Sequence, residues 1–153
     1  MKAIVLFLLT VALASTAGDP AGFHMWKASE LQSFSKTLAP KLKGKSVLSE
    51  PLAGERNYSF SAVLRTASGE VEVHETKADV FVVQSGEATL VVGGKVERAR
   101  TTQPNEVRGS GISGGVEKKL GPGDVVTIPP KTPHQMKVAA GKEVAYLAMK
   151  IAQ

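Results

Sequence analysis

The chain has no cysteine among its 153 residues. Disulfide bonds and thiolate metal ligands are therefore excluded, and the fold must be stabilised by its core, with or without a metal bound through nitrogen and oxygen atoms. Aromatic residues make up only 5% of the sequence, and none alternates with basic residues as in a surface that stacks nucleic-acid bases. Together with a modest net charge of +5, this predicts that the protein has no nucleic-acid partner.

Long hydrophobic runs are missing except for one near the N-terminus. Residues Ala3 to Ala14 are apolar and follow the basic Lys2, but the run is shorter than the about 20 residues that span a bilayer. Small residues follow up to Ala17, a pattern typical of a secretory signal peptide. The sequence therefore predicts residues 1–17 as a signal peptide and a secreted or periplasmic protein with no membrane attachment after cleavage.

Beyond residue 17 the chain is long enough for one domain, and its pattern changes near residue 45. Residues 18–44 form an N-terminal segment in which apolar residues recur at helical spacing from Leu31 to Leu38. Ser29 precedes them as a good N-cap, and Gln32 stands three residues later as in a capping box. The sequence predicts one short helix here, which packs its apolar stripe against the rest of the domain.

Residues 45–153 change to a period of two, which is typical of β-strands. Glycine and proline separate the alternating stretches into short segments. The predicted strands are residues 58–65, 71–74, 80–84, 88–92, 125–128, 135–138 and 144–151. Short antiparallel strands joined by frequent turns predict an all-β sandwich or barrel, in which residues 100–115 form either a mobile loop or a twisted hairpin.

Four side chains of this β-rich region are candidate metal ligands. Alternation places Glu72 and His74 on one face of a strand, with Cα atoms about 7 Å apart, so both side chains can reach one ion. Asp79 has an odd spacing from His74 and needs a bend of the chain to return to the same interior. His134 follows Pro133 at the start of another strand, from which we expect it to approach across the barrel.

The stretch around the first three candidates resembles the first motif of the cupin superfamily, which consists of small β-barrels that often hold one metal ion. When the stretch is aligned on Asp79 and Gly86, Asp79 stands where the family has a glutamate. Glu72 then stands at the position of the family's first histidine, and His74 at that of the second. The first motif is therefore altered at two of its ligand positions.

The second stretch resembles the second cupin motif more closely. Gly123 and Pro129 fit the family pattern, and His134 stands at the position of its last histidine. Lys131 replaces a glycine of the motif, and Val138 replaces an asparagine. The family's metal is usually bound by its three histidines and its glutamate.

The resemblance implies a cupin-like antiparallel jelly-roll barrel over residues 45–153, preceded by the short N-terminal helix. It also implies one divalent transition metal (iron, manganese, nickel or zinc) held by Glu72, His74, Asp79 and His134. Family members commonly form homodimers and bind or convert small organic molecules, so both are expected partners of this chain.

Each candidate ligand also has an ordinary structural explanation. Glu72 can be a salt-bridged strand residue, Asp79 can cap a turn, and either histidine can be a hydrogen-bonded structural residue. Two carboxylates that face one interior repel each other, and a divalent cation, protonation, a water-filled mouth, or a nearby arginine or lysine would each relieve that repulsion. The sequence therefore leaves a metal site and a vacant pocket as alternatives.

Three functions are compatible with these patterns, and whether the protein is an enzyme stays open. They are a metal-dependent enzyme, a metal-free module that binds a small molecule, and a barrel that chiefly dimerises. In an enzyme, Glu72 is either the fourth ligand or, away from the ion, a general base. Phe81 and Met136 share the strand parity of Asp79 and His134, so we expect them to line the same interior, either as core residues or as ligand contacts.

Overall fold

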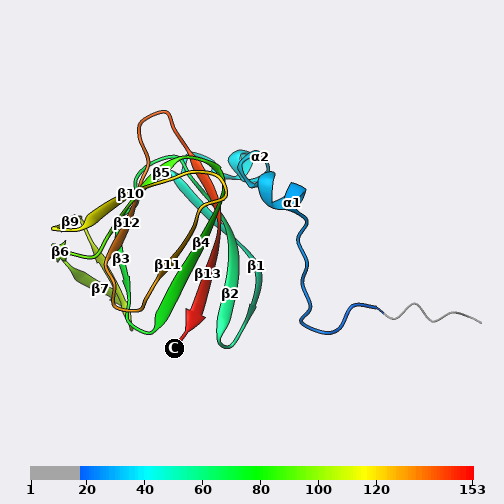
Figure 1. Cartoon of the computed structure of the whole chain (residues 1–153), viewed down its shortest axis with the longest axis horizontal. Coiled ribbons are helices and arrows are strands. Elements are labelled where there is room, and N and C mark those ends of the chain that lie inside the picture. Colours follow the sequence, from blue (N-terminus) through cyan, green and yellow to red (C-terminus); the bar gives the residue numbers. More distant parts are fainter. Residues whose placement is uncertain (1–17) are drawn as a thin grey trace, which may run out of the picture.

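A computed structural model describes residues 18–153, and the predicted signal peptide of residues 1–17 lies outside the described part of the chain. Two antiparallel β-sheets face each other, and two short helices lie on the outer side of one sheet (Figure 1). No helix within residues 18–153 is long and apolar enough to cross a membrane.

The first sheet has five strands in the order β1–β2–β13–β4–β11. They are β1 (Val47–Glu55), β2 (Tyr58–Arg65), β4 (Lys77–Gly86), β11 (Val125–Ile128) and β13 (Val144–Ala152). The last strand, β13, lies in the middle of this sheet and pairs with β2 and β4. Its register places Lys150 opposite Asp79 on β4, so a basic residue stands beside a candidate metal ligand.

The second sheet has six strands in the order β10–β5–β12–β3–β8–β7. They are β3 (Val71–His74), β5 (Ala88–Val92), β7 (Arg100–Gln103), β8 (Glu106–Gly109), β10 (Val116–Leu120) and β12 (His134–Lys137). A two-stranded sheet joins β6 (Lys95–Glu97) and β9 (Gly111–Ser113). Because β3 lies beside β12, His134 is the register partner of Glu72, and the two motifs meet in one sheet.

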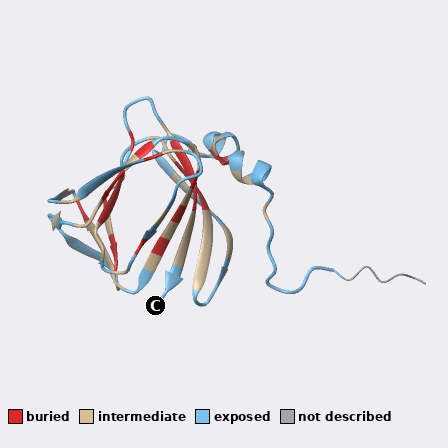
Figure 2. Ribbon diagram, in the orientation of Figure 1, coloured by how far each residue is buried: buried red, intermediate tan, exposed pale blue. Residues whose placement is uncertain are grey.

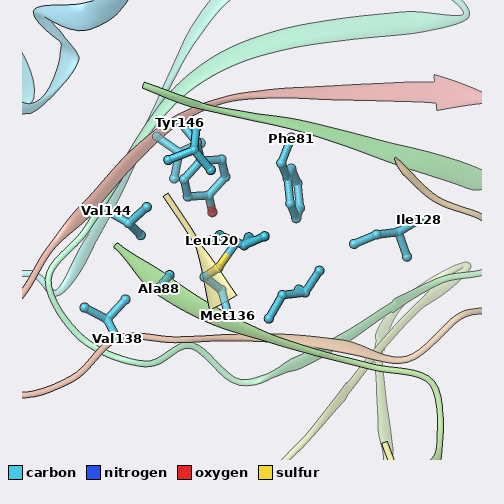
Figure 3. Packing of buried hydrophobic residues seen from close by; sticks show 11 residues of the cluster. Phe81, Ala88, Leu120, Ile128, Met136, Val138, Val144 and Tyr146 are labelled. Carbon is cyan, nitrogen blue, oxygen red and sulfur yellow. The ribbon is translucent and has the colours of Figure 1, made fainter. Parts of the chain in front are cut away.

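The core fills the space between the two large sheets, where apolar side chains from both pack together (Figure 3). The five-stranded sheet supplies Val63, Phe81, Val83, Ile128, Val144 and Tyr146, and the six-stranded sheet supplies Ala88, Leu90, Leu120 and Met136. Buried residues therefore concentrate along the strands, whereas the N-terminal segment is mostly exposed (Figure 2).

The N-terminal segment contains α1 (Ala28–Gln32), α2 (Phe34–Leu38) and a 3₁₀ turn (Ala39–Lys41). Phe34 and Leu38 of α2 are buried against the outward residues of β2 and β13, which form a second apolar cluster on the outer face of the sheet. The predicted packing of the helical stripe is thus confirmed.

The prediction of a single helix capped by Ser29 and Gln32 is wrong. The first helix has Lys27 as its N-cap, because the Lys27 backbone N–H donates to Oε2 of Glu30 at 2.6 Å. It ends at Ser33, whose hydroxyl donates to the Glu30 carbonyl at 2.7 Å. Such a local side-chain bond competes with the next helical turn, so two five-residue helices replace one longer helix.

The seven predicted strands are present as β2, β3, β4, β5, β11, β12 and β13. Residues 100–115 contain β7, β8 and β9, and β7 pairs with β8 in a hairpin that turns at Asn105 with φ 64°. The hairpin alternative therefore holds. Sequence reasoning missed the short strand β6. It also missed β1, which contains Pro51 and Gly54, and β10, which carries three consecutive charged residues. Both are edge strands, where proline and charge protect against further pairing.

The helix α2 is expected to contribute to stability through Leu38, whose side chain is only 2% exposed. Leu38→Ala should lower the free energy of unfolding by about 2–4 kcal/mol, because it removes buried apolar contacts and leaves a cavity. Urea denaturation followed by circular dichroism measures this difference. Lys36→Ala, at an exposed position of the same helix, is the control and should change the free energy by less than about 0.5 kcal/mol. Equal effects of the two substitutions would contradict the packing described.

Candidate metal centre

Three strands position the four predicted ligands. Glu72 and His74 lie two residues apart on β3, so their side chains share one face of the strand. His134 begins β12, the neighbouring strand of the same sheet. Asp79 lies on β4 in the opposite sheet, because the chain crosses between the sheets at residues 75–76. The expectation that His134 approaches from across the barrel is therefore wrong, and Asp79 is the residue that comes from the opposite side.

The four side chains converge on one place between the sheets. Ligand atoms of Glu72, His74 and His134 all lie within 4.8 Å of one another, a group that can hold a metal ion. Oδ2 of Asp79 lies 3.1 Å from Nε2 of His74 and 3.2 Å from Nε2 of His134. Two ligand atoms at right angles around one ion, each about 2.1 Å from it, lie about 3 Å apart, so these separations fit ligands of a single cation.

Both imidazole rings are held from behind through Nδ1. Nδ1 of His74 lies 2.7 Å from Oε2 of Glu106, and Nδ1 of His134 lies 3.0 Å from the carbonyl oxygen of Thr132. Carboxylate and carbonyl oxygens accept hydrogen bonds only, so each Nδ1 carries a proton and donates it. In its neutral form such a ring directs the lone pair of Nε2 toward the centre, which is how an acceptor behind the ring orients metal-binding histidines.

Two buried atoms at the centre have no hydrogen-bond partner in the described part of the chain, namely Oδ2 of Asp79 and Nε2 of His134. They lie 3.2 Å apart without hydrogen-bond geometry. When the ring is neutral both atoms are acceptors, and two buried acceptors that face each other are unfavourable. A cation between them or a second proton on His134 removes this penalty, and imidazole with carboxylate ligands suits a divalent first-row ion.

Lys150 already brings one positive charge to the centre. Its Nζ donates to Nε2 of His74 and to Oδ1 of Asp79, each at 2.7 Å. Burial alone would raise the pKa of Asp79, but contacts with His134 and His74 and the charge of Lys150 outweigh it, so the pKa lies well below its ordinary value of 3.8. Asp79 is therefore a carboxylate at neutral pH, paired with an ammonium group.

Glu72 is held at the edge of the centre by two arginines. Arg65 Nη2 donates to Oε1 of Glu72 at 2.9 Å, and Nη2 of Arg108 lies 3.6 Å from Oε2. Burial raises the pKa of Glu72, but the charges of Arg65 and Arg108 lower it by more. A carboxylate with a depressed pKa is a weak proton acceptor, so this environment favours Glu72 as a ligand over Glu72 as a general base.

The core residues Phe81 and Met136 lie next to this centre. Both are buried between the sheets (Figure 3). The Phe81 ring lies 6.2 Å from that of His134 and 5.1 Å from that of Tyr146. Their contribution to the core is confirmed, whereas contact with a ligand stays a prediction. His24, the histidine outside both motifs, is exposed and stacks on Trp26.

A pocket of about 350 Å³ adjoins the centre. His74, Glu106, Arg108 and Lys150 line it, together with residues of the β3–β4 and β7–β8 turns. Its volume is within the range of sites that bind small molecules. An apolar pocket of about 420 Å³ lies instead on the outer face of the five-stranded sheet, against Trp26, and shares no residue with the centre.

Similar folds occur among solved structures, although no family model and no curated protein matches the chain. A protein with a double-stranded β-helix domain from Klebsiella pneumoniae is 13% identical over 72% of this chain and 80% of its own, with a TM-score of 0.54. The fold is cupin-like. A polyketide cyclase from Streptomyces resistomycificus is 17% identical over 71% of this chain and 67% of its own, with a TM-score of 0.50. A cupin protein from Bacteroides fragilis is 14% identical over 69% and 76%, with a TM-score of 0.49.

Sequence reasoning missed four residues of this candidate site. Glu106 and Arg108 alternate on β8, and their register places them opposite His74 and Glu72, but residues 100–115 had no predicted strand to carry that alternation. Lys150 shares strand parity with the buried Tyr146, as Arg65 does with the buried Val63. A basic residue on the inward side of an apolar strand was the signal that could have found both.

The depressed pKa of Asp79 predicts a pH-dependent contribution to stability. In metal-free buffer at pH 7, Asp79→Asn should lower the free energy of unfolding by roughly 2–4 kcal/mol, because Lys150 loses its buried carboxylate partner. A carboxylate whose pKa is lower in the folded state stabilises the fold above its ordinary pKa, and this gain is lost as the pH falls below it. In a series from pH 7 to pH 2, the difference between wild type and variant should therefore stay nearly constant down to about pH 5 and shrink as the pH falls below about 4.

Urea denaturation with a chelator present, repeated along that pH series, measures the effect. Asp19→Asn, which removes a carboxylate from an exposed N-terminal position, is the matched control. A difference between wild type and Asp79→Asn that stays constant across the series would show that Asp79 is not the ion-paired carboxylate described.

Proposed function

We propose that this cupin-like domain binds one divalent transition-metal ion through Glu72, His74, Asp79 and His134, and that the ion serves to bind or transform a small organic molecule. Iron, manganese, nickel and zinc are the candidates, since each accepts mixed nitrogen and oxygen ligands. The N-terminal sequence pattern supports an exported protein.

One observation carries the proposal. In a buried place, Oδ2 of Asp79 lies 3.1 Å from Nε2 of His74 and 3.2 Å from Nε2 of His134. Acceptors behind both rings fix a proton on each Nδ1, so each ring, when neutral, presents the lone pair of Nε2 to the centre. Structural histidines in a core normally satisfy both ring nitrogens, whereas Nε2 of His134 has no hydrogen-bond partner within residues 18–153.

The adjoining pocket supports a small anionic molecule as the substrate or ligand. Its lining contains three basic residues, Lys77, Arg108 and Lys150, and one carboxylate, that of Glu106. A divalent ion at the centre would add positive charge and would supply Lewis acidity or activate oxygen or water. A carboxylate-bearing molecule of a size that fits about 350 Å³ is therefore the class that we favour.

A metal-free binding module is the second candidate, and Lys150 favours it. Its ammonium group lies 2.7 Å from both His74 Nε2 and Asp79 Oδ1. This supplies the nearby positive charge that relieves carboxylate repulsion without a metal. In that case the basic pocket would bind an anion directly, and no redox or Lewis-acid chemistry would follow.

Metal analysis separates the two candidates. Protein purified without a chelating tag and dialysed against manganese, iron, nickel or zinc should retain close to one equivalent of at least one ion, measured by plasma mass spectrometry. That ion should raise the melting temperature, because it binds the folded state only. His74→Ala and His134→Ala should each lose at least 90% of the bound metal.

His24→Ala is the matched control, because it removes the third histidine of the chain at an exposed position outside the centre. It should retain the metal content of the wild type. Absence of metal from folded wild-type protein for all four ions, or equal retention by the three variants, would contradict the metal site and would leave the binding module as the function.

A further inference from the structure

We propose that Lys150 is a tethered cation that occupies the centre in the metal-free protein and must leave it before a metal can bind. This inference rests on the proposed metal site and concerns its regulation. Nζ of Lys150 lies within hydrogen-bond distance of two of the four proposed ligands, His74 and Asp79.

The two states exclude each other because Nε2 of His74 has a single lone pair. Nδ1 of the same ring donates to Glu106 at 2.7 Å, so Nε2 is the acceptor and receives the hydrogen bond from Lys150. A metal ion bound to Nε2 needs the same lone pair. The ammonium group and a divalent ion would also repel each other at such short range, so His74 cannot serve both.

The surroundings of Lys150 allow it to leave without any change of the backbone. Its side chain is 34% exposed, whereas that of Asp79 is 1% exposed. Lys150 also lines the pocket that adjoins the centre. Rotation of this long, flexible side chain would bring the ammonium group into the pocket and into water, which hydrates an ammonium group strongly.

Displacement changes the pocket as well as the centre. In the metal-free state the ammonium group of Lys150 forms an ion pair with Asp79. Once released, the ammonium group would join Arg108 and Lys77 on the pocket wall. Metal binding would therefore raise the positive charge of the pocket and favour an anionic molecule there, which makes metal and anion binding mutually supportive.

The test compares metal affinity in wild type and Lys150→Met by isothermal titration with Zn²⁺. Methionine has a similar length but no charge, so it removes the competing cation and preserves much of the side-chain volume. Because wild type must break two charge-assisted hydrogen bonds before it binds the ion, Lys150→Met should bind Zn²⁺ at least about tenfold more tightly. Lys77→Met, which removes a lysine of the same pocket wall, should bind like the wild type.

The outcomes separate the two proposals. Equal affinity of wild type and Lys150→Met, or weaker binding by the variant, would overturn the role of Lys150 and leave the metal site intact. Failure of both folded proteins to bind Zn²⁺, manganese, nickel or iron would overturn the metal site itself. A gain by Lys77→Met equal to that by Lys150→Met would show an unspecific effect of charge and would also overturn the inference.

A second measurement uses the wild-type protein alone, in case Lys150→Met does not fold. An amine held between His74 and Asp79 should react slowly with an acetylating reagent, and its release by Zn²⁺ should raise its rate of acetylation at least threefold. Peptide mass spectrometry reports each lysine separately, and Lys77 serves as the internal control. An unchanged rate at Lys150 with one equivalent of bound Zn²⁺ would overturn the inference.

Discussion

A buried carboxylate is the constraint around which this domain is built. Asp79 is almost fully buried between the two sheets, and an ionised group in such a place needs a positive partner. Its neighbour on the adjacent strand, Lys150, provides one at 2.7 Å, while His74 and His134 face it from the other sheet. The same residue thus connects the two layers of the fold, and any account of the site must say which cation accompanies Asp79.

The topology explains how such distant parts of the sequence reach one point. β3 and β12 are neighbours in one sheet, and the short turn after β3 carries the chain across to β4 in the other. β13 then returns through the middle of that second sheet and brings its basic residue beside β4. The last strand therefore completes the electrostatics of a site whose other members lie in the two motifs, so the site is a property of the whole sandwich.

The amino-acid sequence predicted the parts that depend on strand alternation and on motif spacing. Alternation within β3 was enough to pair Glu72 with His74, and turn residues located most strands. It was not enough to tell on which sheet Asp79 and His134 lie, because strand order depends on tertiary pairing that a local pattern does not contain. The helix capping failed for a local reason, since Glu30 accepts the backbone N–H of Lys27 and the helix begins before Ser29. Glu106, Arg108 and Lys150 were missed because their roles follow from register across strands.

The positive charge of Lys150 reconciles the metal site with the metal-free binding module, two interpretations that otherwise compete. A site that depended entirely on a metal would leave Asp79 uncompensated whenever the metal was lost, and a domain without disulfide bonds would then lose stability at its core. Lys150 on the neighbouring strand balances the charge of Asp79 without a metal. In our proposal, the same ion pair weakens metal binding. Nε2 of His134 and Oδ2 of Asp79 still have no hydrogen-bond partner among the described residues, so the lysine satisfies only part of the site. These two atoms therefore support the proposed metal site, and the ion pair between Lys150 and Asp79 supports a fold that does not depend on it.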